Sequence, residues 1–231
     1  MFRKLSLMIG WIAVLVAVPA VATAALQVGD DIRFINLNGS PGGEFGVAKL
    51  SAPSTQLFVT FCIERNEYLD FSGAGFNVDS ISTAAENGGL GGGSPDPLSD
   101  YTAWLYYQFA TGGLADDGYD SSATESNLLQ NAIWKLEDEP SNIAGAPLVV
   151  SGDPDATYYN LALTSSTAAE RALAADRVRV VNISWLTSRS GAIAGDLGQS
   201  VLMVIPEATT IVVWSVLGLI GMYGQRRRRL D

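Results

Sequence analysis

Residues 126–140, SNLLQNAIWKLEDEP, decide the fold class, because they predict a helix that lies between two groups of strands. Ser122 and Glu125 form a capping box before this segment, and Pro140 ends it. Four apolar residues recur at the spacing of one helical face: Leu129, Ala132, Ile133 and Leu136. The segment is therefore expected to pack one side of a helix against a sheet.

Strand-like segments precede this helix. Residues 31–38, DIRFINLN, alternate so that Ile32 and Phe34 share one face. Residues 54–71, STQLFVTFCIERNEYLDF, begin with a run that is apolar on both faces. Such a run predicts a central, well-buried strand.

Further helices and two more strands surround and follow the central segment. A helix is expected over residues 99–113, with Ser99 as its N-cap and glycines at its end. Another capping box, Thr167 to Glu170, opens a short helix to Ala175. Residues 177–186 and 198–205 predict two strands of a hairpin.

The order of these elements is strands, helices and strands again, without βαβ alternation. It predicts an α+β fold with a mainly antiparallel β-sheet or sandwich and two or three inserted helices. An N-terminal signal and a C-terminal transmembrane helix are expected in addition.

The N-terminus has the layout of a secretory signal peptide. Arg3 and Lys4 form a basic start, residues 5–18 are apolar, and small residues follow at 22–24. Residues 1–24 are therefore predicted to be a signal peptide, and an uncleaved anchor helix is the alternative. Both interpretations predict export.

The C-terminus carries a second membrane signal. Pro206 and Glu207 precede an apolar segment, residues 208–224, and four arginines follow it: Arg226, Arg227, Arg228 and Arg229. A helix of this length measures about 26 Å, slightly less than a bilayer core of about 30 Å. By the positive-inside rule, the basic groups at both ends of the chain belong in the cytoplasm, and the chain between them lies on the other side.

This tail resembles the C-terminal sorting signals of the PEP-CTERM type, in a variant with Ala208 at the position of a second proline. The resemblance implies that signal peptidase and an exosortase process the chain, the latter near Pro206 and Glu207. It predicts a precursor that is anchored in the membrane and then released to the cell surface or an extracellular (biofilm) matrix. A plain C-terminal anchor is the alternative.

Between the two signals, residues 25–205 are expected to form one domain. This span holds 22 of the 24 acidic residues and 8 of the 14 basic ones, which is a net charge of −14. Such acidity argues against a nucleic-acid partner. With one cysteine, the chain cannot form an intramolecular disulfide, and with no histidine it lacks Ser-His-Asp catalysis and His-ligated metal sites.

Two short motifs point to one possible reaction. The motifs FCIE, residues 61–64, and LQNAIW, residues 129–134, resemble the internal-thioester domains at the tips of Gram-positive surface adhesins. The resemblance implies that Cys62 condenses with Gln130, that residues 132–134 seat the glutamine, and that the thioester acylates an amine on a partner surface. The alternative is an ordinary buried cysteine and a hydrogen-bonded glutamine.

A wider set of motifs, FCIERNEY, TAWLYYQFATGGL and LQNAIWKLEDE, resembles the body of small exosortase-sorted proteins of Gram-negative surfaces that have no assigned activity. This resemblance implies surface placement. The sequence as a whole predicts a non-catalytic surface or matrix protein, without cofactor or metal, whose partners are surface polysaccharide or protein amines. The thioester adhesin is the alternative function.

Remaining acidic groups suggest two further kinds of site. Glu64 with Glu67, and residues 137–139, are carboxylate groups of the type that a glycosidase uses, but acidic helix ends are more often solvated. Residues 116–120 and 152–159 are rich in oxygen ligands, yet neither follows the EF-hand spacing. Both runs are expected to be solvated turns.

Overall fold

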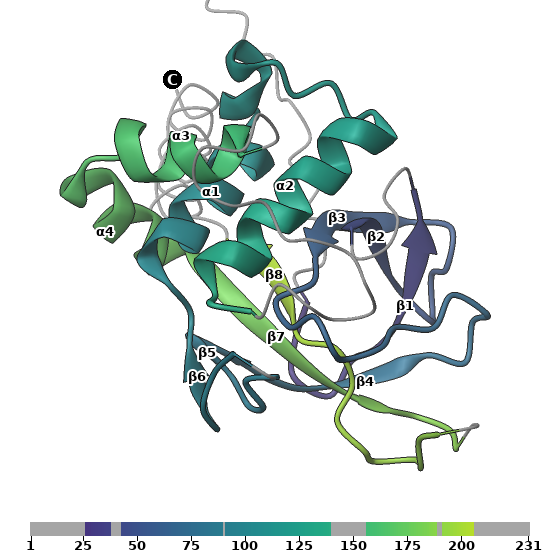
Figure 1. Ribbon diagram of the computed structural model, residues 1–231. Helices are drawn as coiled ribbons and strands as arrows, with labels where there is room; N and C mark the ends of the chain where they lie inside the picture. Colours follow the sequence, from purple (N-terminus) through teal and green to yellow (C-terminus); the bar gives the residue numbers. More distant parts are fainter. Residues whose placement is uncertain (1–25, 38–42, 90, 140–155, 189–190, 206–231) are drawn as a thin grey trace, which may run out of the picture.

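The computed structural model describes residues 26–37, 43–89, 91–139, 156–188 and 191–205 (Figure 1). Its strands are β1 (Asp31–Asn36), β2 (Gly43–Lys49), β3 (Gln56–Phe61), β4 (Phe76–Ser82), β5 (Ala84–Ala85), β6 (Asp96–Pro97), β7 (Val178–Trp185) and β8 (Val201–Val204). Its helices are α1 (Asp100–Thr111), the 3-10 helix η1 (Gly113–Asp117), α2 (Ala123–Leu136), α3 (Thr157–Ser165) and α4 (Ala168–Arg177).

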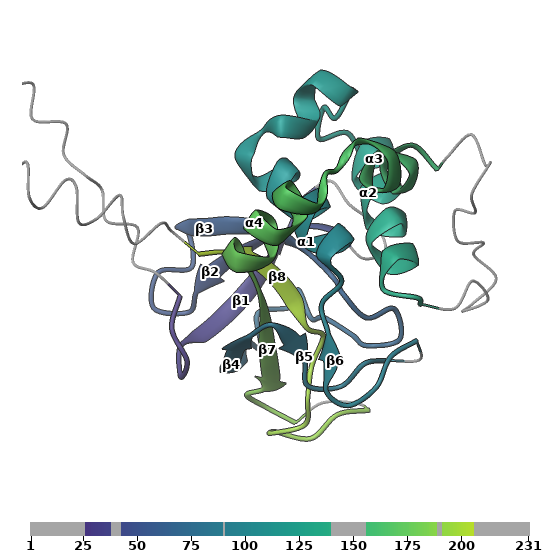
Figure 2. The ribbon, with the colours of Figure 1, turned by 90° about the vertical axis from the view of Figure 1, so that its left-hand side faces the viewer.

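Six strands form one antiparallel sheet in the order β3-β2-β1-β4-β7-β8, and β5 pairs with β6 beside it. The predicted hairpin exists as β7 and β8, with Val180 opposite Leu202. Figure 2 shows the four α-helices grouped on one side of this sheet. This arrangement agrees with the predicted α+β class, with one helix more than expected.

The predicted place of the strand over residues 56–61 was wrong. It was expected to be central, but β3 stands at one end of the strand order and β8 at the other. The two end strands approach each other: Cys62 forms a β-bridge with Val201, and the N–H of Ile63 donates to the carbonyl of Ser200 over 3.1 Å. The strand is apolar on both faces because the sheet curls toward closure there and helices cover its outside.

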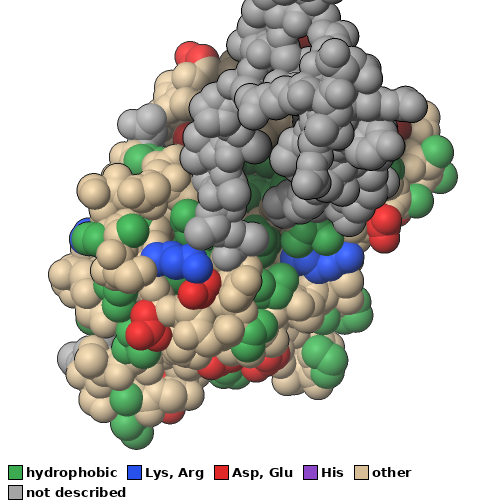
Figure 3. All heavy atoms as spheres, turned by 180° about the vertical axis from the view of Figure 1, so that it is seen from behind, with side chains coloured by type: hydrophobic (Ala, Val, Ile, Leu, Met, Phe, Trp, Pro, Cys, Tyr) green, Lys and Arg blue, Asp and Glu red, His purple; other side chains and the backbone are tan. Residues whose placement is uncertain are grey.

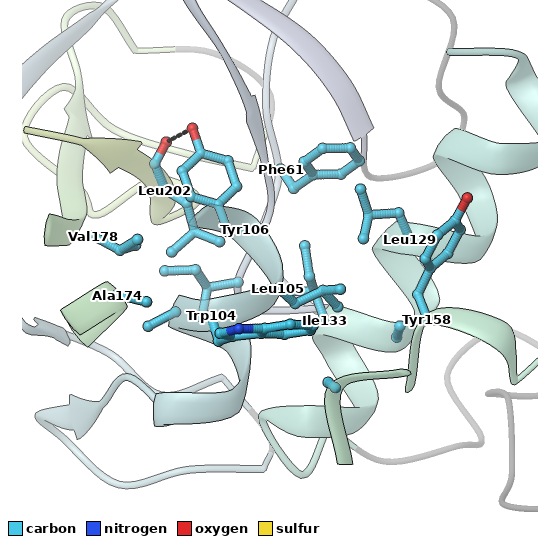
Figure 4. Close-up of a cluster of buried hydrophobic side chains, with 14 of the residues drawn as sticks. Phe61, Trp104, Leu105, Tyr106, Leu129, Ile133, Tyr158, Ala174, Val178 and Leu202 are labelled. Carbon is cyan, nitrogen blue, oxygen red and sulfur yellow. Dashed lines mark hydrogen bonds between the residues drawn. The ribbon is translucent and has the colours of Figure 1, made fainter. Parts of the chain in front are cut away.

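Two hydrophobic clusters lie on opposite faces of the curled sheet. One fills the space between sheet and helices, where Phe61 lies near Leu129 and Tyr106 lies near Leu202 (Figure 4). The other lies on the opposite face, and its largest members are Phe34, Phe45, Phe76, Trp134 and Trp185. Burial of such large apolar side chains is the main stabilising term for a domain of this size.

Helix boundaries follow the capping signals of the sequence. Ser99 accepts a hydrogen bond from the N–H of Thr102, and Gly112 ends α1 in the left-handed conformation, with φ of 81°. At α4, Thr167 and Glu170 form the complete predicted capping box. The box predicted at α2 is half formed, because Ser122 accepts from the N–H of Glu125 but the Glu125 carboxylate accepts from Tyr158 instead.

The predicted signal peptide, Pro206, Glu207, the apolar segment 208–224 and the four arginines lie outside the described residues. Within the described ranges, no helix is both long and apolar enough to cross a bilayer.

Candidate functional site

Cys62 lies at the junction of the two sheet ends, directly after β3. Its side chain is a free thiol and the residue is only 4% exposed. Burial, followed by the negative charges of Glu67 and Glu64, raises the pKa of this thiol well above its usual range. The thiol is therefore neutral at physiological pH, unlike the activated thiolates of cysteine enzymes.

Gln130 lies on the buried face of α2, and its carboxamide contacts the main chain of Cys62 at two points. Its Oε1 accepts from the N–H of Cys62 over 2.9 Å, and its Nε2 donates to the carbonyl of Cys62 over 2.8 Å. The residue is 1% exposed. The structure therefore brings together the two predicted residues, although they are 68 positions apart in sequence.

Gly43, at the start of β2, leaves room for this carboxamide. A Cβ atom at Gly43 would lie 2.9 Å from Oε1 of Gln130 and would also clash with the ring of Phe61. A contact of this kind forces neighbouring groups to move. The absence of a side chain at position 43 is thus one condition for the present position of Gln130.

A second contact fixes α2 one turn before Gln130. The hydroxyls of Ser126 and Tyr119 both donate to Oε2 of Glu44, which lies in β2, each over 2.9 Å. Glu44 is 6% exposed, so these charge-assisted hydrogen bonds are shielded from water. Burial raises the pKa of the Tyr119 hydroxyl, which keeps it protonated as a donor.

The three residues 132–134 of α2 pack into both hydrophobic clusters. Ala132 and Ile133 are buried in the cluster between sheet and helices, and Trp134 belongs to the other cluster, which also contains Cys62. The guanidinium of Arg65 lies over the Trp134 ring, 5.5 Å from its centroid. This cation–π contact joins the segment after Cys62 to the helix that carries Gln130.

The expectation that the acidic residues at the end of α2 are solvated was wrong for Glu137 and Glu139, which are buried, whereas Asp138 is exposed. Glu64 is buried as well. Glu137 accepts a hydrogen bond from the N–H of Ser99, and burial raises its pKa to about 7. The carboxyl groups of Glu64 and Glu139 lie directly against each other. The two carboxylates of a glycosidase are instead separated by a cleft that holds the substrate, so these groups do not form such a pair.

The two oxygen-rich runs have different outcomes. Asp116 and Asp117 belong to η1 and are exposed, as expected for a solvated turn. Residues 152–155 lie outside the described part, and the residues after them form α3, which had not been predicted. Among the described residues, no group of three Asp, Glu, Cys or His side chains converges on one point.

On the face seen in Figure 3, the acidic and basic side chains are scattered among uncharged ones and form no large patch of one charge.

A pocket of about 470 Å³ lies near the Cys62 segment, and its lining includes Asn66, Glu67, Tyr68, Asn87 and Trp185. Asn66 and Glu67 follow Cys62 closely in sequence, so the pocket wall and the site share one segment.

Sequence reasoning missed Gly43, Glu44 and Ser126 as supports of this site. Ser126 stands four residues before Gln130, so the helical period alone placed the two on one face.

Comparison with protein-family models, with curated proteins and with solved structures found no match.

Proposed function

We propose that the chain is an exported surface protein whose domain is a covalent adhesin, with an internal thioester between Cys62 and Gln130. The observation that supports this most strongly is the double hydrogen bond between the Gln130 carboxamide and the main chain of Cys62. It holds an acyl donor beside the residue that carries the chain's single thiol. The proposal requires the thiol of Cys62 to turn toward this carboxamide, and positioning of two reactants in that way can supply much of the activation.

In the first step, Sγ of Cys62 attacks Cδ of Gln130. The S–C bond forms, the Cδ–Nε2 bond breaks, and the thiol proton leaves with the nitrogen as ammonia. Burial raises the pKa of the Cys62 thiol, so the attacking group is a neutral thiol and the step depends on positioning and not on thiolate formation. No oxidant or cofactor enters this balance.

In the second step, an amine of a partner surface attacks the same carbon of Gln130. An amide bond to the partner forms, and the thiol of Cys62 is regenerated. The protein is consumed in a single event, so it is an adhesin and not an enzyme. Of the predicted partners, this chemistry favours protein amines, such as lysine side chains, over polysaccharide that lacks amino groups.

The proposed location rests on the two ends of the sequence. A signal peptide over residues 1–24 exports the chain, and the Pro206-Glu207 signal with its apolar segment and arginines anchors the precursor. Processing by an exosortase then places the acidic domain at the cell surface or in the extracellular matrix. If Cys62 and Gln130 do not react, the remaining function is that of a non-catalytic surface module.

Methylamine tests the proposed reactivity. The intact protein is incubated with methylamine and digested, and the peptide that contains Gln130 is sequenced by tandem mass spectrometry. The proposal predicts methylamide at Gln130 together with one newly exposed thiol at Cys62. The Cys62→Ala variant should incorporate none, and Gln108→Ala, a change of the same type in α1, should react like the wild type.

A further inference from the structure

A buried pair of carboxylates lies beside Cys62. Glu64 is fully buried, and neither of its carboxylate oxygens has a hydrogen-bond donor. Glu139 is 3% exposed; its Oε1 accepts from the N–H of Gly91 over 3.2 Å, and its Oε2 has no donor. Two carboxylates cannot donate to each other, so a proton or a cation must lie between them.

A third oxygen converges on the same place. Oδ1 of Asn66 is buried and also lacks a donor. A Cβ atom at Gly89 would lie 2.5 Å from Oε2 of Glu64, 2.7 Å from Oδ1 of Asn66 and 2.7 Å from Oε1 of Glu139. Three oxygens from three residues therefore surround one point, and Gly89 leaves that side of the space open.

The groups near Glu64 are themselves acidic, namely Glu139, Glu67 and Asp96, so without a cation the Glu64–Glu139 pair must hold a proton. A shared proton would satisfy one oxygen of each carboxylate, but it would leave Oδ1 of Asn66 without a partner. Buried polar atoms are almost always paired, so a group that contacts all three oxygens fits the structure better.

We propose that Glu64, Asn66 and Glu139 form a calcium-binding site. Two carboxylates balance the charge of one divalent cation, and carboxylate and amide oxygens are the donors that calcium prefers. The set contains no nitrogen or sulfur ligand, which argues against zinc. Calcium takes six to eight oxygens, so main-chain carbonyls or water supply the remaining ligands.

The surroundings of the site give a bound ion a structural role. Asn66, one of the three proposed ligands, also lines the pocket of about 470 Å³. A bound ion would join the segment after Cys62 to the end of α2 and to the loop that contains Gly89. It would thereby hold α2 at the end opposite to the Ser126 contact with Glu44, independently of any thioester.

Thermal unfolding of the full chain, measured in EDTA and in calcium chloride, tests the site. At a calcium concentration about 100 times the dissociation constant, the Tm is expected to rise by about 5–10 °C. Titration calorimetry should give one calcium ion per chain. Glu64→Gln should abolish the rise while leaving the Tm in EDTA equal or higher, because the glutamine amide can donate a hydrogen bond to Glu139.

Two control variants show whether the calcium response belongs to this site. Asp116→Asn, in the exposed acidic run of η1, should keep the full calcium response. Cys62→Ala should keep it as well, so that failure of the thioester and failure of the calcium site are distinguished. A Tm that calcium does not change, or an equal response in Glu64→Gln, would overturn the proposal. So would a response to magnesium alone, or stabilisation by acid in EDTA without any response to calcium.

Discussion

The hydroxyl of Thr60 in β3 pairs with both main-chain polar groups of Leu202 in β8, 142 positions later in the chain. It donates to the Leu202 carbonyl over 2.6 Å and accepts from the Leu202 N–H over 3.0 Å. The Thr60 side chain thus links β3 to β8 where the sheet begins to close, in place of main-chain hydrogen bonds between these two strands. Cys62 follows two residues later, so this contact also helps to place the thiol.

Thr60→Val should lower the free energy of unfolding by about 1–3 kcal/mol, because valine has nearly the same shape but leaves the buried N–H of Leu202 without a partner. Urea denaturation measures the change. The matched control is Thr164→Val in α3, whose hydroxyl is exposed, with an expected change within about 0.5 kcal/mol. Equal effects at both positions would contradict the role of Thr60.

Gly43→Ala should displace the carboxamide of Gln130 and slow or prevent thioester formation. The added methyl group would lie 2.2 Å from the ring of Phe61 and 2.9 Å from Oε1 of Gln130, and such overpacking destabilises a protein by about 1–3 kcal/mol. The fraction of chains that have lost ammonia is measured by intact mass. Gly93→Ala is the control, because its Cβ would make only one ordinary contact, 3.4 Å from the carbonyl oxygen of Pro95. If Gly43→Ala reacted as completely as Gly93→Ala, this account of Gly43 would be wrong.

Ser126→Ala and Tyr119→Phe should each destabilise the protein by about 1.5–3 kcal/mol, because each removes a hydrogen bond to the charged oxygen of Glu44. Both hydroxyls contact the same oxygen, so their effects are expected to be coupled by at least about 0.5 kcal/mol. A double-mutant cycle by chemical denaturation measures this coupling. Strictly additive effects would contradict a shared network.

Glu207→Ala should leave the C-terminal segment uncut if an exosortase recognises the Pro206-Glu207 pair. In the producing cell, the mass of the mature protein would then increase by the retained tail. Gln225→Ala, which changes a neutral residue of the same tail, should be processed normally. Normal processing of Glu207→Ala would favour the plain membrane anchor over a sorting signal.

Local signals in the sequence predicted the local structure well. Ser99 and Thr167 cap the helices at which they were expected, and Ile32 and Phe34 are both buried in one cluster. The helix α3 escaped prediction, because its N-cap is Ala156, which makes no side-chain capping bond, and only Tyr158 and Ala162 mark its buried face. Capping and periodicity are the signals on which such predictions depend.

Contacts between residues that are far apart in the sequence were harder to predict. The approach of β3 to β8 depends on contacts of Thr60 and Tyr106 with Leu202, which no local pattern encodes. Similarly, Glu64 and Glu139 each read as an ordinary solvated acid, and only the fold brings them together. The pairing of Cys62 with Gln130 was predicted from a family resemblance; spacing in the sequence alone could not have supplied it.

The mass of the intact, untreated protein tests the central claim most directly. The thioester account predicts that the wild-type protein is lighter than its sequence by one ammonia, and that Cys62→Ala and Gln130→Ala each have the mass of their own sequence. A wild-type mass equal to its sequence, with one thiol that becomes titratable on unfolding, would contradict the account. The double hydrogen bond between Gln130 and Cys62 would then be a structural contact only.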